Sequence, residues 1–376
     1  AEAEIEAIAD NPSPATFENT VVALETSGRT LTRLNALFSV HTSNLNVGVM
    51  PDVERSVVPK LSEHEDKIIQ NSRLFARIET VANDPQTKQL DPSQQRLVEQ
   101  LYKRFVRQGA KLSPQDKERL SKINLRLASL FTDFSQNVLA DEQGYGTWIE
   151  DKQDLAGLPT SVVNGMAAVA KDKGQAGKWA ITNTRSSVDP FLTYSENRAL
   201  REQVWRNFYN RGDNGDQHDN NAIISEILKL RAARAKLLGY ETHAHWRLEP
   251  QMAKKPEAAM ALMMQVWPKA VARVHEEVAD MQHIADSEGA KLTIEPWDYR
   301  FYAEKVRKQK YDLDFNQVKP YLQLEKLREG MMWAAGKLYG FQFDQIHDVP
   351  VFHPDVRVWR VDDAHGNLVG LWYFDP

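Results

Sequence analysis

The sequence contains no cysteine, which excludes disulfide bonds and thiol chemistry anywhere in the chain. It also lacks an apolar run as long as the roughly 18 residues that a membrane-spanning helix requires. The formal net charge of −5 is small for 376 residues, so the large basic field with which proteins attract nucleic acid is missing. We therefore expect neither a membrane nor a nucleic acid as a partner.

The first residues, Ala1-Glu-Ala-Glu-Ile-Glu6, carry no initiating methionine and already follow a helical pattern. No signal peptide is visible in them. The expected compartment is the cytoplasm. The periplasm remains open for a protein whose signal peptide has been removed upstream, because the lack of cysteine fits either compartment.

Helical periodicity dominates residues 1–140. Two helix starts stand out, because Asp91 and Ser113 are each followed by proline at the first helical position. With 42% hydrophobic residues, the chain can bury a sizeable core and has the length for two or three domains. An apolar stripe at intervals of three or four residues predicts a helix that packs on a bundle; it comprises Phe17, Val21, Leu24, Leu31, Leu34, Leu37 and Phe38.

Glycines and short apolar runs interrupt this pattern between residues 141 and 195. The runs at 145–149 and 179–182 predict a small sheet, which flanks a helix near residues 160–171. Helical spacing resumes at about Glu196 and dominates as far as residue 340.

Within that helical stretch, Pro256 opens one long run that continues to about Ser287. No fixed repeat period occurs, so a solenoid is not expected. Four regions are predicted: an N-terminal helical region at 1–140, a small mixed α/β insertion at 141–195, a helical lobe at 196–348 and the first strands of a sheet at 349–376.

The last region predicts a hairpin. Residues 356–361 alternate between two unlike faces, and a polar turn that contains Gly366 follows them. The returning strand, Val369 to Phe374, is apolar on both faces apart from Gly370. Such a strand is expected to be covered by further strands or helices, either from another chain or from sequence beyond these 376 residues.

Two segments come close to the zinc motif H-E-x-x-H, in which two histidines four apart bind the metal and the glutamate activates water. His64-Glu65 is followed by Ile68 where the second histidine belongs, and His275-Glu276 by Ala279. One imidazole of this motif cannot hold zinc against competition from water, so each is interpreted as a surface histidine on an amphipathic helix. We therefore predict no catalytic residue and no metal ligand in this chain.

Other candidate sites also favour structural interpretations. His243 and His245 are two residues apart, which on a helix separates them by about 200°, so they could share a metal ion only in an extended segment, where Glu241 or Glu249 could join them. Packing around Trp246 is the better explanation. Arg211-Gly-Asp213 matches an integrin-binding tripeptide but is typical of a helix end and a polar turn. The acidic residues of that turn, Asp213 to Asp216, lack the spacing of a calcium-binding loop.

An aromatic cluster is the main surface candidate. Aromatic rings with hydroxyl tips suit a peptide channel, because the rings cover apolar side chains and the hydroxyls meet backbone carbonyls. Packing between helices is the competing interpretation for each residue, and for any single one it is the favoured interpretation. The candidates for a substrate channel are Trp297, Tyr299, Tyr302, Tyr311 and Tyr321.

Four separated motifs, in the same order, resemble the thimet-oligopeptidase family of zinc metallopeptidases, above all its bacterial peptidyl-dipeptidases (dipeptidyl carboxypeptidases). They are Glu196-Asn-Arg-Ala-Leu-Arg-Glu-Gln-Val-Trp-Arg-Asn-Phe-Tyr-Asn-Arg-Gly212, Leu237-Leu-Gly-Tyr-Glu-Thr-His-Ala-His-Trp246, Pro296-Trp-Asp-Tyr-Arg-Phe-Tyr-Ala-Glu-Lys-Val-Arg307, and Phe352-His-Pro-Asp-Val-Arg-Val-Trp359 with the later Gly370-Leu-Trp-Tyr-Phe-Asp375. The resemblance runs from about Phe17 to Pro376, but the family's zinc motif is not in the chain.

The resemblance implies a mainly α fold, an elongated multi-helix lobe with a small β-sheet region that forms half of a two-lobed channel peptidase. It implies a zinc enzyme that removes C-terminal dipeptides from short peptides, with the zinc-bearing half missing here, so that this chain alone binds no zinc and is inactive. An endo-acting oligopeptidase of the same family is the first alternative. The second is a complete, non-catalytic helical protein that binds peptides or acts as a scaffold.

Overall fold

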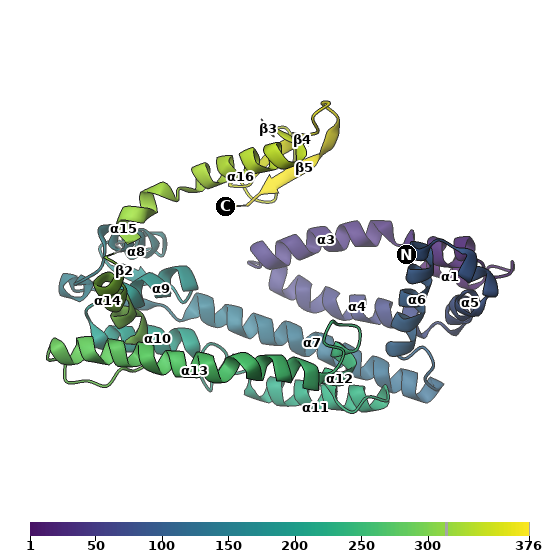
Figure 1. The fold of residues 1–376 in the computed structure, drawn as a ribbon, viewed down its shortest axis with the longest axis horizontal. Helices are drawn as coiled ribbons and strands as arrows, with labels where there is room; N and C mark the ends of the chain where they lie inside the picture. The colour runs from purple at the N-terminus through teal and green to yellow at the C-terminus, as the bar shows by residue number, and fades with distance from the viewer. Residues whose placement is uncertain (313–314, 376) are drawn as a thin grey trace. The chain divides into compact units, whose positions relative to one another are not determined.

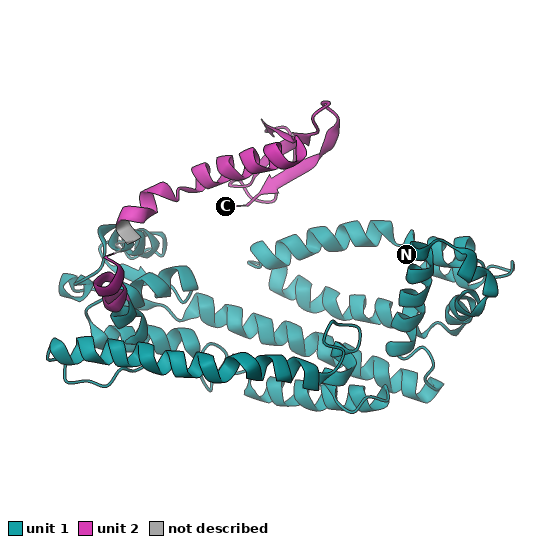
Figure 2. Cartoon of the chain, viewed as in Figure 1, with its two compact units in different colours: residues 1–303 teal, residues 304–376 magenta. Residues whose placement is uncertain are grey.

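The computed structural model describes residues 1–312 and 315–375, and helices predominate in it (Figure 1). The chain divides into two compact units, residues 1–303 and 304–376 (Figure 2). Two small antiparallel sheets are the only sheets among the described residues. The mainly α class predicted from the sequence is thereby confirmed. None of the described helices combines the length and the hydropathy that crossing a lipid bilayer demands.

The first unit opens with helices that share one apolar core. Ile78 and Leu74 of α5 are fully buried there, together with Phe105 of α6. Asp91 caps α6 in front of Pro92, and its carboxylate accepts the backbone N–H groups of Ser93 and Gln94, so that helix start is confirmed. The elements are α1 (Glu2–Ala9), the π-helical η1 (Phe17–Val22), α2 (Ala23–Glu25), α3 (Arg29–Asn44), α4 (Met50–Gln70), α5 (Ser72–Asn83), η2 (Pro85–Gln89) and α6 (Pro92–Arg107).

Two long helices continue the unit. α7 (Pro114–Gly144) begins at the predicted Ser113-Pro114 cap and has 31 residues, about 46 Å at 1.5 Å per residue. α11 (Asn221–Leu237) packs along it through a small apolar cluster that contains Ile227. The short α12 (His243–Leu248) follows α11 after a turn.

The predicted small sheet is confirmed. Strand β1 (Thr147–Ile149) pairs antiparallel with β2 (Trp179–Ile181), and α8 (Thr160–Asp172) lies between them in sequence. A core around Phe191 joins the sheet to α9 (Arg185–Tyr194) and α10 (Arg198–Tyr209). The turn after η3 (Lys152–Leu155) is tight: Gly157 has φ +82°, and the amide of Glu196 donates to the carbonyl of Ala156 at 3.0 Å.

The predicted long helix is α13 (Pro256–Ser287), with Pro268 inside it. Its C-terminal part is anchored by Met281, Ile284 and Ala285, which are buried. Its N-terminal part is apolar and exposed. More than half of each large apolar side chain between 260 and 267 is accessible: Met260 54%, Leu262 64%, Met263 53%, Met264 52%, Val266 60% and Trp267 63%.

The second unit takes most of α14 (Tyr299–Tyr311) and contains α15 (Phe315–Val318), η4 (Lys319–Tyr321), α16 (Leu324–Tyr339) and one sheet. The predicted hairpin is confirmed as β4 (Arg357–Asp362) and β5 (Leu368–Phe374), and Trp359 pairs with Trp372. A further strand, β3 (Gln342–Ile346), pairs with the other side of β4 and lies within the range assigned from the sequence to the helical lobe. β5 is an edge strand among the described residues, and its Val369 and Leu371 are exposed.

Candidate functional site

The candidate aromatic residues are divided between the two units. Trp297, Tyr299 and Tyr302 lie in the first unit at the start of α14, whereas Tyr311 and Tyr321 lie in the second. Tyr311 and Tyr321 are 70% and 82% exposed, so they do not belong to a packed core. Tyr302 is only 4% exposed, which supports the packing interpretation for this residue.

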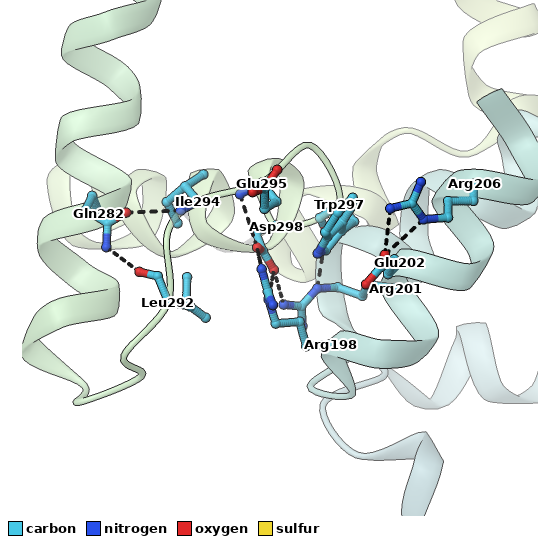
Figure 3. A network of polar contacts seen from close by, with 10 residues as sticks. All are labelled: Arg198, Arg201, Glu202, Arg206, Gln282, Leu292, Ile294, Glu295, Trp297 and Asp298. Atoms are coloured by element: carbon cyan, nitrogen blue, oxygen red, sulfur yellow. Dashed lines mark hydrogen bonds and ion pairs between the residues drawn. The ribbon is translucent and has the colours of Figure 1, made fainter. Parts of the chain in front are cut away.

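Asp298 organises the three aromatic residues of the first unit. Its fully buried carboxylate accepts hydrogen bonds from Arg198 Nη2 at 2.7 Å and from Arg201 Nη2 at 2.8 Å (Figure 3). It also accepts the backbone N–H of Glu295, which fixes the turn before α14. The two arginines stand one turn apart on α10, so the ion pair ties the start of α14 to α10.

Arg201 is itself 2% exposed and fully engaged. Besides Asp298, it donates to the carbonyl of Ser195 at 2.7 Å and to that of Trp297 at 3.3 Å. Burial alone would raise the pKa of Asp298, but the hydrogen bonds from Arg198 and Arg201 outweigh it, and the pKa lies below its usual value. The carboxylate is therefore ionised at neutral pH and neutralises the buried guanidinium.

Trp297 lies on the surface that this network shapes. Its ring packs edge-on against Trp205 at 5.8 Å, and the guanidinium of Arg206 lies 5.0 Å from its centre. The indole Nε1 is buried and has no hydrogen-bond partner among the described residues. The nearby hydroxyl of Tyr299 donates to Glu277 at 3.2 Å. The indole ring of Trp297 is thus partly exposed, whereas its N–H is closed off from solvent.

A second group of residues, some with shifted pKa values, surrounds a cavity of about 270 Å³ between α4, α7 and α11. Arg234 and Trp246 line it, and the guanidinium lies 4.7 Å from the indole centre. His243 packs against Trp246 at 5.5 Å between ring centres, as the sequence predicts. Burial, followed by the positive charges of Arg234, Arg231 and Arg247, lowers the pKa of His243 to about 4.

We expect His243 to stay neutral at every pH above about 5, which NMR titration of its ring protons would measure. Since an unfolded histidine has a pKa of about 6.5, the unfolded chain takes up this proton first, and His243 makes the fold less stable as the pH falls from about 6.5 to about 4. A His243→Gln variant identifies the resonance by its loss. Titration of that resonance near pH 6.5 would contradict the burial of this ring.

The near-misses to the zinc motif do not form ligand sets among the described residues. His64 Nδ1 lies 3.8 Å from a carboxylate oxygen of Glu2, and His275 is exposed on α13. Elsewhere among the described residues, one group of three possible metal ligands does occur, formed by Asp141, Asp216 and His218. Local sequence patterns do not reveal this group, because Asp141 is far from Asp216 and His218 along the chain and no short spacing joins the three.

Comparison with known proteins gives the context of these residues. Residues 191–376 match the model of Peptidase family M3. The chain is 38% identical over 374 residues to the dipeptidyl carboxypeptidase of Escherichia coli (strain K12), an alignment that covers 99% of this chain and 55% of that protein. It is 28% identical over 375 residues to the oligopeptidase A of the same strain, again covering 99% of this chain and 55% of the relative.

A plant relative extends the comparison beyond bacteria. The organellar oligopeptidase A of Arabidopsis thaliana is 32% identical over 390 residues, covering 100% of this chain and 48% of that protein. The chain thus spans about half the length of the curated relatives it matches. The recognition made from the four motifs is confirmed: the chain belongs to the thimet-oligopeptidase family, peptidase family M3.

Proposed function

We propose that this chain is part of a zinc metallopeptidase that removes C-terminal dipeptides from short peptides. The observation that carries the proposal is a difference between two relatives from one organism. Identity is 38% to the dipeptidyl carboxypeptidase of Escherichia coli and 28% to its oligopeptidase A, over nearly the same length of this chain. The higher identity favours dipeptide release over endo-cleavage.

We place the catalytic zinc in the half of the relatives' length that this chain does not span. The 376 residues contain no H-E-x-x-H, the motif that supplies two zinc ligands and the general base in helical zinc peptidases. Bound there, zinc would polarise the scissile carbonyl and activate water. The residues present would serve to bind and orient the peptide, and this chain alone should hydrolyse none.

Peptide binding is assigned in this proposal to the aromatic residues. Trp297 is partly exposed, and since its N–H is buried, the face of its indole ring would be the part that covers an apolar side chain of the substrate. Tyr299, Tyr311 and Tyr321 expose their rings and could cover apolar side chains of a peptide. Tyr302 is buried, so its part would be to hold the first turn of α14 in place.

Exposed apolar surfaces support the presence of a covering partner, which we propose to be the other half of the same protein. One surface is the N-terminal part of α13, where six large apolar side chains between 260 and 267 are more than half exposed. Another is the edge strand β5, with Leu368 and Val369 60% and 54% exposed. Large exposed apolar surfaces are more often sites of contact with another protein than surfaces that face only solvent.

The test is a peptidase assay on the complete protein, with the other half joined to this chain or added to it. A short peptide with a free C-terminus should lose its last two residues, and the same peptide with an amidated C-terminus should be cleaved far more slowly. Chelation should abolish the activity and zinc should restore it.

Equal cleavage of both peptides at internal bonds would instead assign the endo activity of an oligopeptidase. No cleavage of either peptide in the presence of zinc would contradict both assignments. In that case the non-catalytic peptide-binding role would remain, and binding of the uncleaved peptide could be measured directly by calorimetry.

A further inference from the structure

The loop between α10 and α11 closes over the last turns of α7. Its Gly212 N–H donates to Asp141 Oδ2 at 2.7 Å, and Asn214 Nδ2, 73 residues after Asp141, donates to the same oxygen at 2.8 Å. Further along the loop, Asn220 Nδ2 donates to the carbonyl of Phe134 at 3.1 Å. These bonds hold the loop firmly and satisfy one of the two oxygens of Asp141.

The other oxygen of Asp141 is not satisfied. The side chain is fully buried, and Oδ1 has no hydrogen-bond partner among the described residues. His218 Nδ1 is 3.4 Å away, which is close enough for an ion pair only if that ring is protonated. A buried carboxylate oxygen without a partner is costly, so this position favours a positively charged ligand.

Two loop residues complete a set of donors around that oxygen. Asp141, Asp216 and His218 each offer one ligand atom, and these atoms all lie within 4.8 Å of one another. Asp216 is held in place by Tyr145, whose hydroxyl donates to Oδ2 at 2.7 Å, and by the backbone N–H of His218, which donates to Oδ1 at 2.8 Å. These two bonds orient the Asp216 carboxylate next to the other two ligand atoms.

We propose that Asp141, Asp216 and His218 bind a divalent transition metal, with zinc preferred. In a tetrahedral site with ligand distances near 2.0–2.1 Å, neighbouring ligand atoms are roughly 3.3 Å apart, and Asp141 Oδ1 and His218 Nδ1 are already 3.4 Å apart. Asp216, on the exposed side, would supply the third ligand after a small shift of its side chain, which leaves a fourth position for water.

The donor set decides between metals. An imidazole nitrogen with two carboxylate oxygens suits zinc and, less strongly, manganese. Calcium and magnesium prefer ligand sets made of oxygen alone, so a site with an imidazole nitrogen disfavours both. The site would fasten the end of α7 to the loop before α11, and it is independent of the zinc proposed for catalysis.

The test compares the zinc content of four forms of the protein after chelator treatment, addition of zinc and dialysis. Asp216→Asn and His218→Gln each remove a ligand at an accessible position, and Asp213→Asn is the matched control, with the same charge change in the same loop. The wild-type protein and the control should hold one more zinc per chain than the two ligand variants, whose affinity for that zinc should fall at least about 10- to 100-fold.

Equal zinc content in all four forms would overturn the proposal, since the ten histidines of the chain could then account for any zinc that binds. Thermal unfolding gives a second readout. Zinc should raise the melting temperature of the wild-type protein and of Asp213→Asn, but not of the ligand variants. Magnesium and calcium at the same concentration should raise none of them, and a rise with zinc that persists in both ligand variants would also overturn the site.

Discussion

Asp298→Asn is expected to lower the free energy of unfolding by about 3–5 kcal/mol, the usual cost of breaking a buried ion pair. The variant keeps the shape of the side chain but removes the charge that neutralises Arg201, which is 2% exposed. Chemical denaturation at neutral pH would measure the loss. The matched control is Asp52→Asn, because Asp52 pairs with Arg55 at the surface with 84% of its side chain exposed. That change should cost no more than about 0.5 kcal/mol.

The difference in stability between the wild-type protein and Asp298→Asn should also depend on pH. The pKa of Asp298 lies below its usual value because the hydrogen bonds from Arg198 and Arg201 outweigh the effect of burial. A carboxylate of this kind contributes stability above its unfolded pKa of about 3.9 and loses the contribution as the pH falls through its folded pKa. The gap between wild type and Asp298→Asn should therefore be constant near neutrality and narrow below about pH 4. A gap that widens in acid would contradict the ion-pair explanation.

Gly157→Ala is expected to destabilise the protein by roughly 2–4 kcal/mol, the sum of backbone strain and overpacking. Gly157 has φ +82°, and an added Cβ would lie less than 3.0 Å from the backbone carbonyl oxygen of Tyr194. That oxygen belongs to the main chain at the end of α9, so it cannot turn aside as a flexible side chain could. Thermal or denaturant unfolding would measure the change.

Gly174 provides the control for this substitution. It has a similar φ of +76°, but an added Cβ would meet no atom within 4 Å. Gly174→Ala should therefore cost only the strain of a left-handed backbone, about 1 kcal/mol. An equal loss of stability in the two variants would contradict a destabilising contact between the added Cβ and the Tyr194 carbonyl oxygen.

Much of the helical part of the fold could be predicted from the sequence, because helices are specified locally. Proline after a capping residue marks the starts of α6 and α7, and Pro256 marks that of α13. Strand β3 could not be predicted in the same way. Its sequence, Gln342-Phe-Asp-Gln-Ile346, does not alternate between apolar and polar residues, and it is a strand because it pairs with β4.

The candidate sites depend on contacts that no local pattern reveals. The sequence places Trp297, Tyr299 and Tyr302 together because they are neighbours on one segment. Their environment depends on Arg198, 100 residues from Asp298, and on Arg201. The group of Asp141, Asp216 and His218 is likewise assembled by a loop that folds back on α7. Only the tertiary structure distinguishes a buried, unpartnered carboxylate oxygen from an ordinary surface aspartate.

The exposed part of α13 also has a chemical consequence. Because the chain has no cysteine, its nine methionines are its only sulfur atoms and its main targets for mild oxidants. Met260, Met263 and Met264 lie together on this helix, and each is more than half exposed. Conversion to sulfoxides would turn one apolar helix surface into a polar one without touching a buried core. Oxidation of this chain should therefore change which surfaces α13 can bind well before it changes how the chain folds.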